Sequence, residues 1–116
     1  HMPAVHYALG YYKEATGEID QAERHYLMAV NLNPKGGIEH NHLGAFWCRQ
    51  GKFRESEKEF LKAVEDPEYS QSAEAFENAG LCVSMIPDKA KAVEYLEKAV
   101  RMDPKRTEAL LELGNI

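Results

Sequence analysis

The 116-residue sequence has no run of about 18 apolar residues, so we expect no segment of it to cross a membrane. It also has no excess of positive charge, because 14 Lys and Arg stand against 19 Asp and Glu and give a formal net charge of -5. Nucleic acids are bound by basic surfaces, so this balance argues against a nucleic-acid partner. No signal peptide is visible, and residues 1–2, His1-Met2, are interpreted as a tag remnant.

Side chains arranged for catalysis or metal binding are missing as well. His40 and His42 are two residues apart, so on a helix they point to different sides and cannot chelate one metal ion. Carboxylates occur with basic residues at helical spacing, as Glu55 does with Lys58, which is typical of a solvated face. The sequence therefore predicts a protein that is not an enzyme and has no cofactor and no metal site.

What the chain does contain is a repeated pattern of small residues. Gly10 and Gly44 are separated by 34 residues, Gly44 and Gly80 by 36, and Gly80 and Gly114 again by 34. A proline closes each full copy, at Pro34, Pro67 and Pro104. Helical hairpins of about 34 residues with small residues at fixed places are the tetratricopeptide pattern, and the chain resembles that family over nearly its whole length.

This resemblance implies an all-α fold, a tetratricopeptide solenoid of helical hairpins with about three and a half repeats in a right-handed superhelix. We expect one domain over residues 3–116, with repeats at about 3–36, 37–72 and 73–106 and a partial repeat at 107–116. Each hairpin would pack only on its neighbours, so stacking would be the source of stability.

Three local features carry further expectations. Ser56 stands where the second helix of a repeat usually has alanine, and its hydroxyl can bond back to its own helix. Asp88 can cap the helix that follows it. Leu110, Leu111 and Leu113 of the partial repeat lack a second helix to cover them, so this half-repeat either caps the third, or marks a truncated chain, or mediates self-association.

The first helix of each repeat lines the concave side of such a solenoid, where a protein or peptide partner binds. From the repeat register, the expected partner-binding groove consists of Tyr7, Tyr11, Glu14, Asn41, Ala45, Arg49, Glu77, Leu81, Ser84 and Met85. This mixture of aromatic, amide and apolar side chains, with Arg49 as the clearest charged anchor, suits an extended or helical peptide. Tyr7 and Tyr11 could instead pack against a preceding helix.

The groove lacks the residues by which some tetratricopeptide domains hold the C-terminal carboxylates of chaperones. Those domains use Lys, Asn, Asn, Lys and Arg, whereas the corresponding positions here are Tyr7, Tyr11, His42, Glu74 and Asn78. None matches, and Glu74 reverses the required charge. We therefore expect no chaperone cofactor of that type.

The two cysteines, Cys48 and Cys82, lie in the first helices of adjacent repeats, and those helices are neighbours in a stacked solenoid. A disulfide between them is possible if their Cα atoms come within about 7 Å. The alternative is two small buried thiols, a common role of free cysteine.

Two strings, HNHLGAFWCRQGKFRESEKEFLKAVEDPEY and AFENAGLC, resemble a narrower group, the PilF/PilW type of lipoproteins of type IV pilus biogenesis. The shared residues are Asn41, Gly44, Cys48, Asp66, Pro67, Tyr69, Asn78, Ala79, Gly80 and Cys82. This resemblance implies a pilotin, which assists outer-membrane localisation and assembly of the pilus secretin. It also implies a secretin subunit as partner, a location on the periplasmic face of the outer membrane, and a membrane attachment through an N-terminal lipid anchor that this chain does not contain. The alternative is a generic cytosolic tetratricopeptide adaptor for an unknown peptide or protein.

Overall fold

The structure is a computed structural model that describes residues 2–87 and 89–116. Within these residues the chain forms seven helices and no strand, which confirms the predicted all-α fold of helical hairpins. The helices are α1 (Met2–Ala15), α2 (Ile19–Leu32), α3 (Gly37–Arg49), α4 (Phe53–Val64), α5 (Ser72–Val83), α6 (Lys89–Met102) and α7 (Thr107–Asn115). His1 of the expected tag remnant and the expected cap Asp88 lie outside the described residues.

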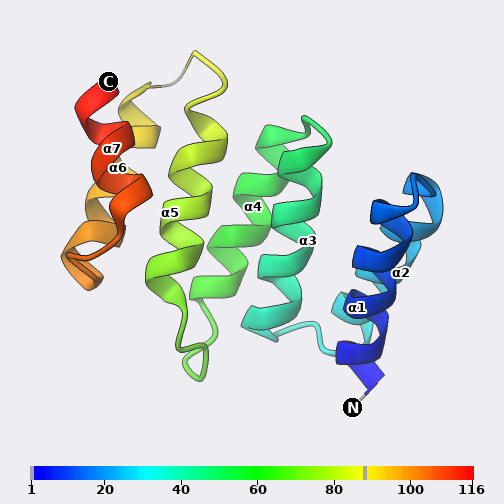
Figure 1. The fold of residues 1–116 in the computed structure, drawn as a ribbon. Coiled ribbons are helices and arrows are strands. Elements are labelled where there is room, and N and C mark those ends of the chain that lie inside the picture. The colour runs from blue at the N-terminus through cyan, green and yellow to red at the C-terminus, as the bar shows by residue number, and fades with distance from the viewer. Residues whose placement is uncertain (1, 88) are drawn as a thin grey trace.

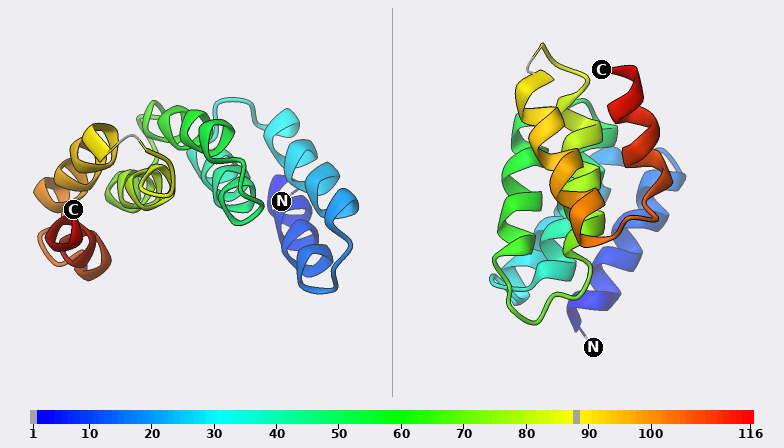
Figure 2. Two further views of the ribbon diagram at one scale, coloured as in Figure 1. Left: turned by 90° about the horizontal axis from the view of Figure 1, so that it is seen from above. Right: turned by 90° about the vertical axis from the view of Figure 1, so that its left-hand side faces the viewer.

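The helices are arranged as a curved row of hairpins. Helices α1 and α2, α3 and α4, and α5 and α6 form hairpins that stand side by side, and α7 follows at the end (Figure 1). Seen from above, the row follows an arc with α2, α4 and α6 on its outer side and α1, α3, α5 and α7 on its inner side (Figure 2). We call these two sets the outer and inner helices, and the concave surface of the inner helices the inner face.

Glycines at the repeated positions let the two helices of each hairpin approach closely. An added Cβ would lie 3.0 Å from Tyr26 at Gly10, 2.9 Å from Phe60 at Gly44 and 2.5 Å from Leu96 at Gly80. A side chain at these positions would force the helices apart. At Gly114 nothing lies within 4 Å, because α7 has no second helix opposite it among the described residues.

The core lies between the two layers and continues from hairpin to hairpin. One cluster joins Phe60 of α4 to Phe76, Val83 and Leu96 of the third hairpin, and Leu113 packs against it. Leu113 is therefore partly covered by this core, whereas Leu110 and Leu111 remain exposed.

Ser56 is a fully buried small residue, and its hydroxyl makes no hydrogen bond among the described residues. The Ser56 hydroxyl oxygen is buried and has no partner among the described residues, so it does not bond back to its own helix. An unsatisfied buried hydroxyl costs stability.

Candidate protein-binding face

Aromatic side chains line the inner face at the joint between the first two hairpins. Tyr7 of α1 stacks on His42 of α3, with ring centroids 4.1 Å apart. Tyr11, one turn further along α1, keeps 66% of its surface exposed. Burial lowers the pKa of His42, so its imidazole is neutral near pH 7, although the negative charges of Glu39 and Glu74 act to raise that pKa. This part of the face offers flat, uncharged rings.

The expected charged anchor Arg49 is already paired. Its Nε and Nη2 atoms donate to the two carboxylate oxygens of Glu14 at 2.6 and 2.8 Å, and this contact raises the pKa of Arg49. The hydroxyl of Tyr26 donates to the same carboxylate at 3.3 Å, and burial together with the Glu14 charge raises the pKa of Tyr26 to about 12. Arg49 and Glu14 therefore join α3 to α1 as a neutral pair rather than offering a free charge.

Further along, amide and carboxylate groups connect α3 with α5. The buried Asn41 donates to Glu74 Oε1 at 3.3 Å and accepts from Asn78 Nδ2 at 3.5 Å. Ala45 and Leu81 are half-buried and pack against the core. These residues shape the centre of the inner face.

Glu77, also expected in the groove, is buried and already paired within the protein. Only 5% of its surface is exposed. Its carboxylate pairs with Arg106 Nη2 at 3.1 Å and accepts from the backbone N–H of Ala109 at 2.9 Å. Since Ala109 lies in the first turn of α7, Glu77 satisfies a free amide at the start of that helix. The expectation for Glu77 is corrected accordingly: it holds α7 against α5.

Ser84 and Met85, the last two expected groove residues, directly follow α5. The Ser84 hydroxyl donates to the backbone oxygen of Leu81 at 2.6 Å, so it is used within its own helix end. Met85 beside it is 68% exposed. Of the ten expected residues, Tyr11 and Met85 thus present the most open apolar surface.

A disulfide joins two inner helices. Cys48 of α3 and Cys82 of α5 are bonded, with a Cα–Cα distance of 5.9 Å that suits the geometry of such a bond. The sequence had left open whether these cysteines pair or stay as separate thiols. The bond fixes the second hairpin against the third on the side that would meet a partner.

The connection between α4 and α5 folds back on the start of α3, which sequence reasoning did not foresee. Asp66 Oδ2 accepts from the backbone N–H of Gly37 at 2.8 Å, which caps α3. Tyr69 lies so close to Gly37 that an added Cβ there would sit 2.5 Å from its side chain. The sequence signals that could have indicated this contact are the Gly36-Gly37 pair and the two extra residues between Gly44 and Gly80.

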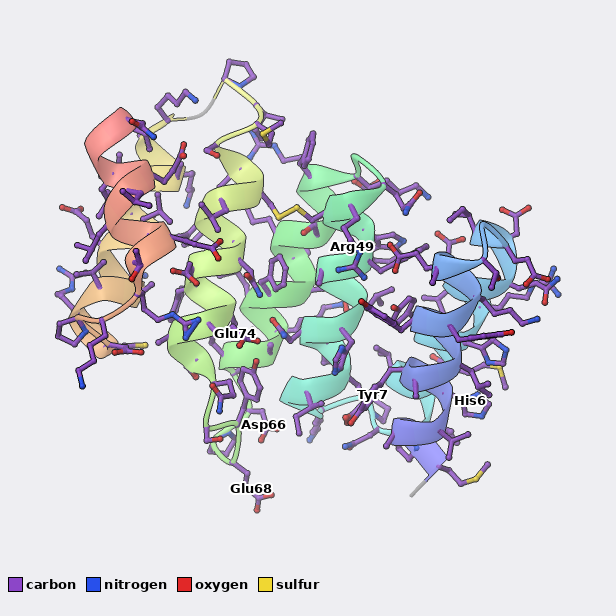
Figure 3. All side chains as sticks on the ribbon, viewed as in Figure 1. His6, Tyr7, Arg49, Asp66, Glu68 and Glu74 are labelled. Carbon is purple, nitrogen blue, oxygen red and sulfur yellow. A yellow bond between two sulfur atoms is a disulfide. The ribbon has the colours of Figure 1, made fainter. Side chains whose placement is uncertain are left out.

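This contact creates a hollow at one end of the inner face, which we call the α1–α3 hollow. It is lined by Ala4, Tyr7, Asn33, Gly36, Gly37, Ile38, Glu39, Asp66, Glu68, Tyr69, Ser70 and Gln71 and has a volume of about 430 Å³. Figure 3 shows Tyr7 between α1 and α3, and Asp66 and Glu68 on the connection at the foot of α5.

A buried ion pair supports the base of the second hairpin and was also missed. Both ring nitrogens of His40 lie 2.6 Å from acceptors, Glu59 Oε1 and the backbone oxygen of Pro34. Both nitrogens can donate to these acceptors only when the ring is protonated, so this arrangement favours the charged form. The hydrogen bond to Glu59 accordingly raises the pKa of His40 against the effect of burial.

Within residues 2–87 and 89–116, no helix is both long and apolar enough for a membrane span. In the same part of the chain no three His, Cys, Asp or Glu side chains gather as metal ligands do.

Comparisons with known proteins agree with this architecture. The tetratricopeptide repeat family matches residues 3–35 and 48–107. An uncharacterized protein of Haemophilus influenzae is 40% identical over 104 residues, which cover 90% of this chain and 58% of that protein. The type IV pilus assembly protein PilF of Pseudomonas aeruginosa is 27% identical over 112 residues, which cover 97% of this chain and 44% of that protein.

Solved structures of other proteins share this helical-hairpin fold. The structure of Pseudomonas aeruginosa PilF superposes with a TM-score of 0.92 at 26% identity, covering 97% of this chain and 51% of that one. The first tetratricopeptide domain of Spaghetti (RPAP3), bound to an HSP90 peptide, superposes with a TM-score of 0.87 at 19% identity, covering 98% and 89%. The chain thus spans about half the length of the curated relatives it matches. With family matches over more than half of its residues and this hairpin architecture, the chain belongs to the tetratricopeptide repeat family of helical protein-interaction scaffolds.

Proposed function

We propose that this scaffold works in type IV pilus biogenesis as a pilotin-like factor that binds a secretin segment on its inner face. The observation that carries the proposal is the similarity to PilF, which extends over 97% of the chain in sequence and in structure. The proposed setting is the periplasmic face of the outer membrane, reached as a lipoprotein.

Residues of the two sequence strings that resemble the PilF/PilW type support this proposal, because they shape the inner face. Cys48 and Cys82 join α3 to α5, and Asp66 caps α3. Tyr69 packs against Gly37 and walls the α1–α3 hollow. A disulfide also suits an oxidising compartment such as the periplasm. The strings thus have a structural role at the surface that would contact the secretin.

Capture of purified secretin fragments by the immobilised protein tests the proposal. Tyr11→Ser and Met85→Ser remove the two most exposed apolar side chains among the expected groove residues, 66% and 68% exposed, without touching the core. Each is expected to weaken capture roughly tenfold if it is an anchor of the interface.

The chain offers matched controls for both substitutions. Tyr12→Ser changes the neighbouring tyrosine, which is also exposed, and Met102→Ser changes an exposed methionine of an outer helix. Both controls should capture secretin as the unmodified protein does. Equal capture by all four variants would refute the inner face as the binding surface, and no capture by the unmodified protein would refute the secretin as partner.

The second candidate is a general adaptor for a peptide of another protein. It is favoured by the superposition on the RPAP3 domain, which covers 89% of that domain, a larger share than for PilF. The five positions at which some tetratricopeptide domains hold the C-terminal carboxylate of a chaperone nevertheless carry other residues here. Tyr7 is stacked on His42, and Glu74 accepts a hydrogen bond from Asn41. Fractionation of cells that express the natural full-length protein separates the candidates, because an adaptor of the cytosol would not be found with the outer membrane.

A further inference from the structure

Charge is distributed unequally between the two layers of the solenoid. The inner helices carry six carboxylates and only two basic side chains, Lys13 and Arg49. Both are paired, Lys13 with Glu18 at 3.4 Å and Arg49 with Glu14. The outer helices carry seven carboxylates and eight basic side chains. Even with Glu77 paired to Arg106 and Glu14 to Arg49, the described inner helices therefore carry an excess of negative charge.

The α1–α3 hollow concentrates this excess. Three carboxylates line it, those of Glu39, Asp66 and Glu68, and no Lys or Arg is among its lining residues. The start of α3 supplies about half a positive charge there, which the capping carboxylate of Asp66 more than offsets. Among the described residues neither Glu39 nor Glu68 has a basic side chain within this hollow, although Glu68 also lines a neighbouring hollow that contains Lys35 and Lys62.

Glu39 is the unusual member, because a buried carboxylate normally has a cation beside it. Only 5% of its surface is exposed. Among the described residues its carboxylate has one hydrogen-bond donor, the Asn33 amide at 2.7 Å, and no basic partner. The nearby His42 does not fill that role, because burial lowers its pKa and keeps it neutral. A buried charge that lines a hollow without a counter-charge points to a ligand that brings one.

Two tyrosines give the hollow a wall suited to such a ligand. Tyr7 and Tyr69 both line it, and Tyr69 is held in place against Gly37. Burial, with the charge of Glu74, raises the pKa of Tyr69, so its ring stays neutral. Cations bind favourably over tyrosine rings, and the alkyl stem of a long basic side chain packs on apolar surface such as Ile38.

We propose that the α1–α3 hollow receives a Lys or Arg side chain of the partner peptide. The inference rests on the proposed binding of a protein segment to the inner face and adds the chemistry of one recognised residue. It places the basic residue of the partner at the joint of α1 and α3, with its charged group toward Glu39 and Glu68 and its stem along Tyr7.

The test uses two short synthetic peptides as probes, Ac-Ala-Gly-Arg-Gly-Ala-NH2 and the same peptide with neutral citrulline in place of arginine. Each is titrated into the ¹⁵N-labelled protein while amide chemical shifts are followed. The arginine peptide is expected to shift the amides of Gly36, Gly37, Ile38 and Tyr69 in a salt-sensitive manner. The citrulline peptide is expected to leave them unchanged.

Two variants and one control locate the effect. Glu39→Gln keeps an acceptor for Asn33 but removes the charge, and Glu68→Gln removes the exposed charge of the connection. Each is expected to weaken binding of the arginine peptide about two- to fivefold. Glu65→Gln is the control, because Glu65 lies on the same connection but lines a different hollow.

The outcomes separate this inference from the proposed function. Equal shifts with both peptides, or binding of the arginine peptide that Glu39→Gln and Glu68→Gln leave unchanged, would overturn the basic-residue site. So would shifts confined to the region of Arg49 and Met85. Secretin capture could still succeed in each of these cases, so the pilus proposal would stand or fall on its own assay.

Discussion

Reduction of the Cys48–Cys82 disulfide is expected to lower the free energy of unfolding by about 4 kcal/mol. The bond joins residues 34 positions apart. Loop-closure entropy for a loop of that length corresponds to about 4 kcal/mol at 25 °C, because the cross-link removes conformations from the unfolded chain. A chain of this size typically has a total stability of about 6 to 17 kcal/mol, so the loss would be a large share of it.

Urea unfolding of the oxidised and the reduced protein, followed by circular dichroism, measures this difference. The two forms contain the same side chains, so packing differences of a mutant do not enter. The reduced unfolded chain is less compact and exposes more surface, so the dependence of the free energy on urea should also steepen on reduction. Fluorescence of the single tryptophan, Trp47, checks whether the hairpins unfold together.

A difference below about 1 kcal/mol, with an unchanged urea dependence, would refute the reasoning from loop entropy. If fluorescence and circular dichroism gave separate transitions, the repeats would unfold independently, and the loop would constrain only the hairpins that it joins.

Three further outcomes are expected. Ser56→Ala should raise the free energy of unfolding by about 1 kcal/mol in urea titrations, because it removes a buried hydroxyl without a partner; an unchanged or lowered value would contradict this. Gly44→Ala should lower stability by about 1 to 3 kcal/mol by pressing a Cβ against an aromatic ring 2.9 Å away. At the equivalent position in α7, the Cβ added by Gly114→Ala would have nothing within 4 Å, so this variant should be neutral or more stable by up to about 1 kcal/mol. Similar losses of stability in the two variants would contradict the prediction. The pKa of His40 is raised, so its contribution to folding stability is full below its unfolded pKa of 6.5 and is lost as pH rises through its folded pKa. The pKa of Glu59 is lowered, so its contribution to folding stability is full above its unfolded pKa of 4.5 and is lost as pH falls through its folded pKa. The stability difference between the protein and His40→Gln should therefore be largest between about pH 4.5 and 6.5, and a difference that grows above pH 7 would contradict the pair.

The hairpin fold follows from the sequence because its determinants are local and repeated. Gly44 and Gly80 recur at one position, and each faces a large side chain of the paired helix. The contact needs a small residue on one helix and a bulky one on the other, so helical periodicity is enough to find it.

Contacts between repeats were harder to predict, because they depend on how far each hairpin is rotated on the next. The repeat register places Glu77 in the groove, yet its carboxylate reaches Arg106, just before α7, and Ala109 in the first turn of α7. Arg49 likewise reaches Glu14 across the first joint. Long charged side chains have many rotamers, so helix register places their Cα atoms but not their ends.

The contact of the α4–α5 connection with α3 could not be predicted from the sequence for another reason. Asp66 acts on Gly37, 29 residues earlier, through a backbone amide that leaves no trace in a side-chain pattern. The hollow beside it exists only because this connection folds back, so its lining residues come from three segments that no single motif joins.

The disulfide described above also has a mechanical consequence for the arc. It covalently fixes α3 to α5, while α1 is held to α3 by the Arg49–Glu14 ion pair and by stacking of Tyr7 on His42. Thermal bending should therefore be concentrated at the first joint, which is the more compliant one. The α1–α3 hollow spans that joint, with lining residues on both sides of it. An occupant of the hollow would thus stiffen the arc where it bends most easily and set the curvature of the whole inner face.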